Sequence, residues 1–117
     1  MSRDQQRLAD YLAHIIEAIE RIDRYTEGMS EAAFLENVMA QDAVIRNLEI
    51  IGEASNNIEK HYPTFAADHP ELPLAFAYQM RNVIAHGYFK VDIEIVWNTI
   101  RRDLPGLYRQ VKQALDQ

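Results

Sequence analysis

Apolar residues recur every three or four positions along the first part of the chain. This spacing places them on one stripe of an amphipathic helix, and charged residues fill much of the opposite side. The pattern predicts a helix over residues 3–25, with Gly28 at or just beyond its end. The apolar stripe consists of Leu8, Tyr11, Leu12, Ile15, Ile19 and Ile22.

A second run of apolar positions predicts a short helix over residues 30–39 and a long helix over residues 41–60. Ser30 is a suitable N-cap because its hydroxyl can accept a hydrogen bond from a free backbone N–H. Glu31 suits the positive first turn of the short helix. The pattern leaves open whether the two helices form one bent helix. The apolar face contains Phe34, Leu35, Val38, Val44, Ile45, Leu48, Ile51 and Ile58.

Prolines and a glycine divide the next part of the chain. Two prolines within residues 61–72 predict a loop, because prolines this close stop a helix. Pro73 suits the first position of a new helix, where its missing N–H costs nothing. That helix is expected to run to about His86, and Gly87 is suited to the left-handed cap after it.

The last apolar stripe predicts a helix that begins near Val91 or Asp92 and is kinked at Pro105. No segment alternates with the period of a strand. We therefore expect an all-α fold, an up-down bundle of four main helices with one short accessory helix.

Composition and charge refine this expectation. The length of 117 residues fits a single domain over residues 1–117. The chain has no cysteine, which excludes disulfides and thiolate metal sites. Its start is polar and no apolar run could span a bilayer, so we expect a cytoplasmic protein. The net charge is −6, with 6 basic and 14 acidic residues over residues 1–80 and 6 and 4 over residues 81–117. An anionic substrate is therefore expected to meet the C-terminal third.

Residues 81–88 read R-N-V-I-A-H-G-Y and concentrate the candidate chemistry. The helix C-terminus favours a protonated His86, which suits proton transfer near neutral pH. Arg81 presents a planar fork to phosphate oxygens, although a continuous helix would separate it from His86 by roughly 140°. On spacing alone, His86 could be a capping residue, Arg81 a surface ion-pair residue and Tyr88 a packing residue.

The string has the form R-x4-H-x-Y, and here the chain resembles the HepT-like toxins of the HEPN ribonuclease superfamily. Residues 41–54, with I-G-E-A at their end, resemble the long central helix of that family. Val91-Asp92, the helix around Trp97 and Leu104-Pro105 resemble its C-terminal part. The resemblance covers nearly the whole chain.

The resemblance implies a homodimer in which two copies of the motif face one cleft. It implies a metal-independent endoribonuclease toxin that needs no cofactor and has Arg81 and His86 as catalytic residues. It also implies a partner, a minimal nucleotidyltransferase antitoxin of the MntA type, which silences the toxin by transferring AMP to Tyr88. Asn82 and Gly87 are expected to support the site. The alternative is a HEPN subunit that binds substrate or nucleotide beside a nucleotidyltransferase without cleaving RNA.

Three further sets of polar residues stay open at this point. Arg46, Glu49 and Glu53 form a row on the long helix, either a solvated face with one ion pair or a support for the site or the dimer. His61 and His69 share a loop, but their spacing matches no metal signature, so no metal site is expected. A basic set could guide RNA or simply be solvated. It consists of Arg101, Arg102, Tyr108, Arg109 and Lys112.

Overall fold

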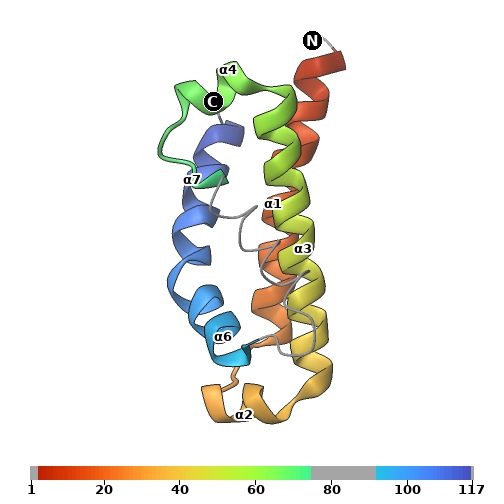
Figure 1. Cartoon of the computed structure of the whole chain (residues 1–117), viewed down its shortest axis with the longest axis vertical. Coiled ribbons are helices and arrows are strands. Elements are labelled where there is room, and N and C mark those ends of the chain that lie inside the picture. The colour runs from red at the N-terminus through yellow and green to blue at the C-terminus, as the bar shows by residue number, and fades with distance from the viewer. Residues whose placement is uncertain (1–2, 75–91, 117) are drawn as a thin grey trace.

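The computed structural model describes residues 3–74 and 92–116, and the regular elements of this part are all helices (Figure 1). The prediction of an all-α fold is confirmed for these residues. The helix predicted from Pro73 to His86 lies almost entirely outside them, so the count of four main helices stays a prediction. The described helices are α1 (Arg3–Tyr25), α2 (Glu31–Glu36), α3 (Val38–His61), α4 (Pro63–Asp68), α6 (Ile93–Arg102) and α7 (Leu104–Asp116).

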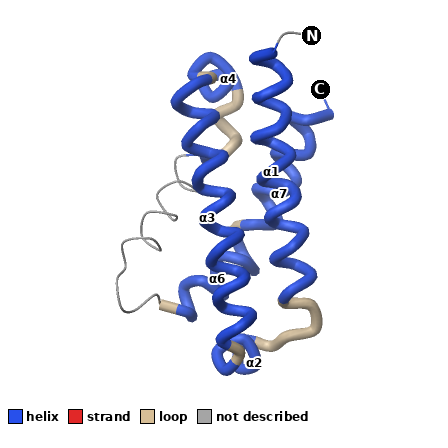
Figure 2. The backbone as a smooth tube through the Cα atoms, turned by 90° about the vertical axis from the view of Figure 1, so that its right-hand side faces the viewer, coloured by secondary structure: helices blue, strands red, loops and turns tan. Residues whose placement is uncertain are grey.

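The two long helices α1 and α3 lie side by side and run in opposite directions, and α7 packs along α1 (Figures 1 and 2). Their facing stripes form one apolar core, because residues three and four positions apart share a helix face. Ile15, Ile22, Leu48 and Ile58 are fully buried there, and Val111 of α7 joins them. Among the described residues, no helix has the length and apolar content needed to cross a lipid bilayer.

The break between α2 and α3 lies at Asn37, three residues earlier than the sequence pattern suggested. Asn37 adopts an extended conformation with φ −108° and ψ 92°. Its side-chain oxygen accepts a hydrogen bond from the backbone N–H of Ala40 at 2.9 Å. Asn37 therefore caps a new helix, and the possibility of one bent helix is excluded. The predicted cap at Ser30 is confirmed, since its hydroxyl accepts from Ala33 N at 3.1 Å.

The prediction that residues 61–72 form only a loop is wrong. The short helix α4 begins at Pro63, which occupies its first turn where no backbone N–H is needed. The helix ends at Asp68, and His69 is its non-helical C-cap, because Pro70 disfavours the helical conformation of the residue before it. The first of the two prolines thus starts a helix, and only the second stops one.

The predicted C-terminal helix is divided into α6 and α7 at Asp103. Asp92 caps the start of α6, since its carboxylate accepts hydrogen bonds from Glu94 N at 3.0 Å and Ile95 N at 3.3 Å. Pro105 falls in the first turn of α7, where its missing N–H is tolerated. The proline therefore marks the start of a second helix and not a kink within a continuous one.

Aromatic packing holds α2 against α6 at the end of the molecule remote from α4 (Figure 2). The rings of Phe34 and Trp97 lie with their centroids 5.2 Å apart. The guanidinium of Arg101 lies over the Trp97 ring, 4.6 Å from its centroid, and donates a hydrogen bond to Met29 O at 3.2 Å. These contacts tie the turn after α1 to the C-terminal part of the chain.

Candidate functional site

The residues of the R-x4-H-x-Y string lie outside the described part of the chain. This applies to Arg81, Asn82, His86, Gly87 and Tyr88. Their roles therefore stay predictions, and the site is built here from the described polar residues on α1 and α3.

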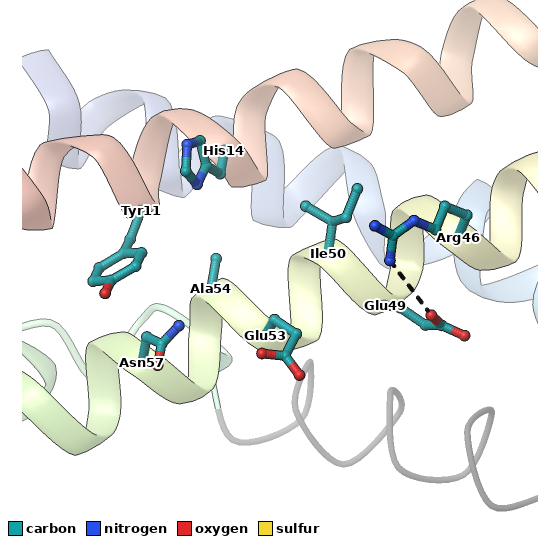
Figure 3. A pocket seen from close by; sticks show the side chains of 8 residues that line it. All are labelled: Tyr11, His14, Arg46, Glu49, Ile50, Glu53, Ala54 and Asn57. Atoms are coloured by element: carbon teal, nitrogen blue, oxygen red, sulfur yellow. Dashed lines mark ion pairs between the residues drawn. The ribbon is translucent and has the colours of Figure 1, made fainter.

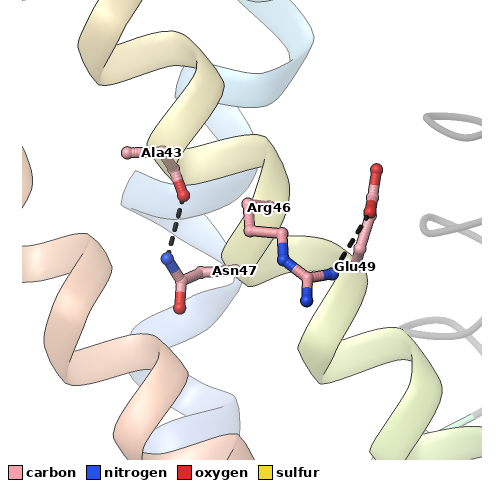
Figure 4. A network of polar contacts seen from close by, with 4 residues as sticks. All are labelled: Ala43, Arg46, Asn47 and Glu49. Atoms are coloured by element: carbon pink, nitrogen blue, oxygen red, sulfur yellow. Dashed lines mark hydrogen bonds and ion pairs between the residues drawn. The ribbon is translucent and has the colours of Figure 1, made fainter.

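The polar row on α3 includes an exposed ion pair between Arg46 and Glu49. Arg46 Nη1 lies 3.8 Å from Glu49 Oε2, with side-chain exposures of 71% and 35% (Figure 4). A pair this open to solvent contributes at most about 1 kcal/mol. Asn47, the next residue, turns away from the row and donates to Ala43 O at 2.9 Å. The guanidinium of Arg46 is thus held by a weak, solvent-exposed pair.

A hollow of about 400 Å³ opens between α1 and α3 beside this row (Figure 3). We call it the Arg46 hollow. Tyr11 and His14 reach it from α1, and the other lining residues come from α3. Its polar groups include two carboxylates, an amide, an imidazole and a guanidinium. The described lining consists of Tyr11, His14, Arg46, Glu49, Ile50, Glu53, Ala54 and Asn57.

A second hollow of about 320 Å³ lies farther along the same pair of helices, and we call it the Arg7 hollow. It is lined by Arg7, Tyr11, His61 and Tyr62. The rings of Tyr11 and Tyr62 meet edge to face, with centroids 6.4 Å apart and planes at 67°. Tyr11 lines both hollows, so the two hollows adjoin. The described residues of the Arg7 hollow include no carboxylate.

Tyr11, Tyr62 and Arg7 were not predicted from the sequence as site residues. Tyr11 was assigned to the apolar stripe of α1, and the structure shows that its half-buried ring also faces the groove between α1 and α3. His14, on the same helix, is exposed at the rim of the Arg46 hollow. The available signal was the pairing of basic and aromatic residues on the polar edges of α1 and α3.

The two histidines considered as metal ligands are separated in role. His61 lines the Arg7 hollow at the end of α3. His69 stacks on Phe65 with centroids 4.1 Å apart, and its Nδ1 lies 3.0 Å from Phe65 O. Within the described ranges, no group of three or more His, Cys, Asp or Glu side chains is arranged to hold a metal ion.

Part of the C-terminal basic set has a structural role. Arg101 packs on Trp97 as described above. Tyr108 of α7 donates a hydrogen bond to Glu20 Oε2 of α1 at 2.9 Å, and this bond to a carboxylate raises the pKa of Tyr108 above its ordinary value of 10.0. Arg102, Arg109 and Lys112 are exposed. The expectation that the set guides RNA thus stays untested for these three residues. Arg101 and Tyr108 have structural contacts as well.

The family model described as "Ribonuclease HepT-like" matches residues 15–114 of this chain. The chain belongs to the HepT-like ribonuclease family. It is 44% identical over 98 residues to a protein of Thermococcus cleftensis named "Probable ribonuclease HepT", covering 84% of this chain and 86% of that protein. The resemblance inferred from the R-x4-H-x-Y string is therefore confirmed at the level of the family.

Two further relatives agree with this assignment. A protein of Caldanaerobacter subterraneus named as a "Putative RNase" is 36% identical over 107 residues, which cover 92% of this HepT-like chain and 93% of the relative. A Methanocaldococcus jannaschii protein named "Gamma-glutamylcyclotransferase and putative RNase" is 35% identical over 107 residues, but the match covers only 47% of its length. No solved structure gave a significant match.

Proposed function

We propose that this HepT-like chain is an endoribonuclease and the toxin of a toxin–antitoxin pair. The observation that carries the proposal is the R-x4-H-x-Y string at residues 81–88, which lies inside the region matched by the family model. Relatives named "Probable ribonuclease HepT" and "Putative RNase", which align along most of this chain, support it. We propose further that residues 1–117 act as one domain in the cytoplasm.

The proposed reaction uses the RNA itself as nucleophile. The 2′-hydroxyl loses its proton and attacks the adjacent phosphorus, and the bond from phosphorus to the 5′-oxygen breaks as that oxygen gains a proton. His86 moves these protons, and Arg81 stabilises the charge that develops on the phosphorane oxygens. The products are a 2′,3′-cyclic phosphate and a 5′-hydroxyl, and no metal-bound water is required.

A homodimer resolves the separation of Arg81 and His86 on one helix. A helix turns by about 100° per residue, so a continuous helix over residues 81–86, as the sequence predicts, would direct the two side chains roughly 140° apart. With two copies of the string at one cleft, residues from both protomers can act on one phosphate. One His86 can then serve as base and the other as acid.

The proposed regulator is a minimal nucleotidyltransferase of the MntA type that transfers AMP from ATP to Tyr88. The tyrosine oxygen attacks the α-phosphorus of ATP and loses its proton, and pyrophosphate leaves. The new phosphodiester adds negative charge and a bulky nucleoside beside the catalytic residues. It would repel the RNA backbone and could pair with Arg81, which removes that cation from catalysis.

Cleavage of RNA by purified variants tests the proposal. Loss of an acid–base group costs roughly 10²- to 10⁴-fold in rate, so His86→Ala is expected to lose cleavage by that factor. His69→Ala is the matched control, because His69 stacks on Phe65 and has no place in the proposed chemistry. Cleavage should persist in the presence of a metal chelator and leave cyclic phosphate ends.

The same experiment distinguishes the ribonuclease from the alternative, a HEPN subunit that binds without cleaving RNA. Circular dichroism and sedimentation would verify that both variants fold and assemble like the wild type. Full-rate cleavage by a folded His86→Ala variant would overturn the assignment of this residue. If the wild type cleaves no RNA and does not slow growth when expressed alone, the chain is a binding subunit beside a nucleotidyltransferase.

A further inference from the structure

We infer that the groove between α1 and α3 binds a single-stranded segment of the RNA, with one nucleotide in the Arg7 hollow. This inference deepens the proposed ribonuclease function and rests on it. The groove consists of the Arg7 hollow and the Arg46 hollow, which adjoin at Tyr11. The match to the family model begins at residue 15, so it does not include Arg7 or Tyr11.

The Arg7 hollow has the chemical parts that a nucleotide requires. Its guanidinium can bind a phosphate through paired N–H donors. The imidazole of His61 carries a ring N–H that can donate a hydrogen bond to the ligand. The half-buried rings of Tyr11 and Tyr62 offer one face and one edge to a base, since they meet at 67°. Proteins bind single strands by combining such aromatic platforms with cations along a groove.

The size and charge of the two hollows assign the parts of the strand. The Arg7 hollow, about 320 Å³, lies at the small end of ligand pockets, which span roughly 300–1,000 Å³, and this suits one nucleotide. In the Arg46 hollow, two carboxylates face one guanidinium, which already pairs with Glu49, so this hollow disfavours a phosphate. Glu49 and Glu53 can instead accept hydrogen bonds from base amino groups. The phosphate therefore belongs beside Arg7, and a neighbouring base belongs beside Asn57.

The groove also changes where the substrate is expected to meet the chain. The net charge of −8 over residues 1–80 pointed to the C-terminal third as the anion-binding part. The acidic side chains of α1 and α3 are not spread evenly, however, because none of the described residues that line the Arg7 hollow is acidic. The Arg7 hollow thus offers a cation beside two aromatic rings within an otherwise acidic segment.

Binding of a short fluorescein-labelled single-stranded RNA, followed by fluorescence anisotropy, tests the inference. The His86→Ala background keeps the RNA intact. Tyr11→Leu removes the stacking ring and should weaken binding by roughly 5- to 150-fold without changing its salt dependence. Tyr25→Leu is the matched control on the same helix, since Tyr25 is 41% exposed and lies outside the groove.

Arg7→Gln separates charge from stacking. It removes one phosphate contact and should reduce the slope of log K against log salt by about 0.7 for a single strand. Arg24→Gln removes an exposed cation at the other end of α1 and should leave that slope nearly unchanged. Ultraviolet crosslinking of the labelled RNA, with peptide mapping, should place a crosslink on the peptide that contains Tyr11. This readout holds even if Tyr11→Leu fails to fold.

Three outcomes would overturn the inference. The first is an equal change of the salt slope in Arg7→Gln and Arg24→Gln. The second is a set of crosslinks that lie outside α1 and α3. The third is an RNA affinity that neither Tyr11→Leu nor Arg7→Gln changes, even though free AMP binds the hollow. Each leaves the proposed function standing if the wild type cleaves RNA in the assay described above. If the wild type cleaves no RNA but the groove still binds it, the proposed ribonuclease activity would be overturned and the proposed RNA-binding groove would stand.

Discussion

The guanidinium of Arg101 lies 4.6 Å from the centroid of the Trp97 ring, one turn earlier on α6. The same guanidinium donates to Met29 O at 3.2 Å. Trp97 in turn packs on Phe34 of α2. One exposed arginine thereby joins α6, the turn after α1 and the aromatic contact that holds α2.

Replacement of Arg101 should show what this junction contributes. We expect Arg101→Ala to lower the free energy of unfolding by about 1–2 kcal/mol. An exposed cation–π contact contributes about 0.5–1 kcal/mol, and the hydrogen bond to Met29 adds a similar amount. Arg102→Ala is the matched control, because Arg102 is also exposed on the last turn of α6. Urea denaturation of the two variants measures the difference, and equal midpoints would contradict the prediction.

The cap at Asn37 is the basis of a second prediction. Asn37→Ala removes the side-chain oxygen that accepts from Ala40 N at 2.9 Å, so the start of α3 loses a partner for one of its free N–H groups. The expected cost is about 1 kcal/mol in the free energy of unfolding. Asn98→Ala, at an exposed position inside α6, should cost nothing because alanine is the better helix former. Thermal melts of both variants would test this, and similar losses would disprove the capping role.

The sequence pattern predicted helices best where the apolar stripe was long. The bounds of α1 agree with the prediction of residues 3–25 because the stripe repeats over several turns. It failed where one residue type serves two purposes. Asparagine occurs both inside helices and at caps, and proline both stops and starts helices. Asn37 was therefore placed within the helix predicted over residues 30–39 and Pro63 within a loop, although the cap at Ser30 was predicted correctly.

The candidate site divides in a similar way. Arg81, His86 and Tyr88 could be named from sequence because they are close together in one short string. Tyr11 and Tyr62 could not, because they are distant along the chain and only the pairing of α1 with α3 brings their rings together. Site residues that are close together in the sequence can be identified from it, whereas a groove between two helices depends on how their apolar stripes pack.

The hydrogen bond between Tyr108 and Glu20 predicts an alkaline loss of stability. That bond, followed by partial burial and the charges of Glu20 and Asp23, raises the pKa of Tyr108 above 10.0. The folded state therefore holds the phenolic proton more tightly than the unfolded state does. The resulting stability is fully present below the unfolded pKa and is lost as pH rises through the folded pKa.

Comparison of wild type with Tyr108→Phe in urea, at neutral and strongly alkaline pH, measures this contribution. The wild type should be the more stable at neutral pH, and the gap should close above about pH 10. Tyr25→Phe controls for the general effect of removing a phenol from α1. A gap of the same size at every pH would show that the bond to Glu20 contributes no titratable stability.

Ser55 provides a prediction of the opposite sign. Its hydroxyl is fully buried in α3 and has no hydrogen-bond partner in the part of the chain that the structure describes. Burying such a group costs about 1–3 kcal/mol, and alanine also favours the helix. Ser55→Ala should therefore raise the melting temperature. Thr26→Val should lower it, because the Thr26 hydroxyl donates to Ile22 O at 2.8 Å. A lower melting temperature for Ser55→Ala would show that its hydroxyl has a partner, such as a buried water.

The last prediction concerns Tyr88 and the proposed antitoxin. Coexpression with a minimal nucleotidyltransferase should add one or more AMP units to the chain, because the phenol oxygen of Tyr88 is the proposed acceptor. Intact-mass spectrometry with peptide mapping would measure the gain and its position. Tyr88→Phe should abolish the mass gain, since phenylalanine has no oxygen to modify, and this variant should stay toxic in the presence of the partner.

Tyr108→Phe, which removes a phenol that donates to Glu20, should be modified like the wild type. A mass gain that survives in Tyr88→Phe would move the acceptor elsewhere. No gain in the wild type would remove AMP transfer from the proposed regulation and leave the ribonuclease to the cleavage assay.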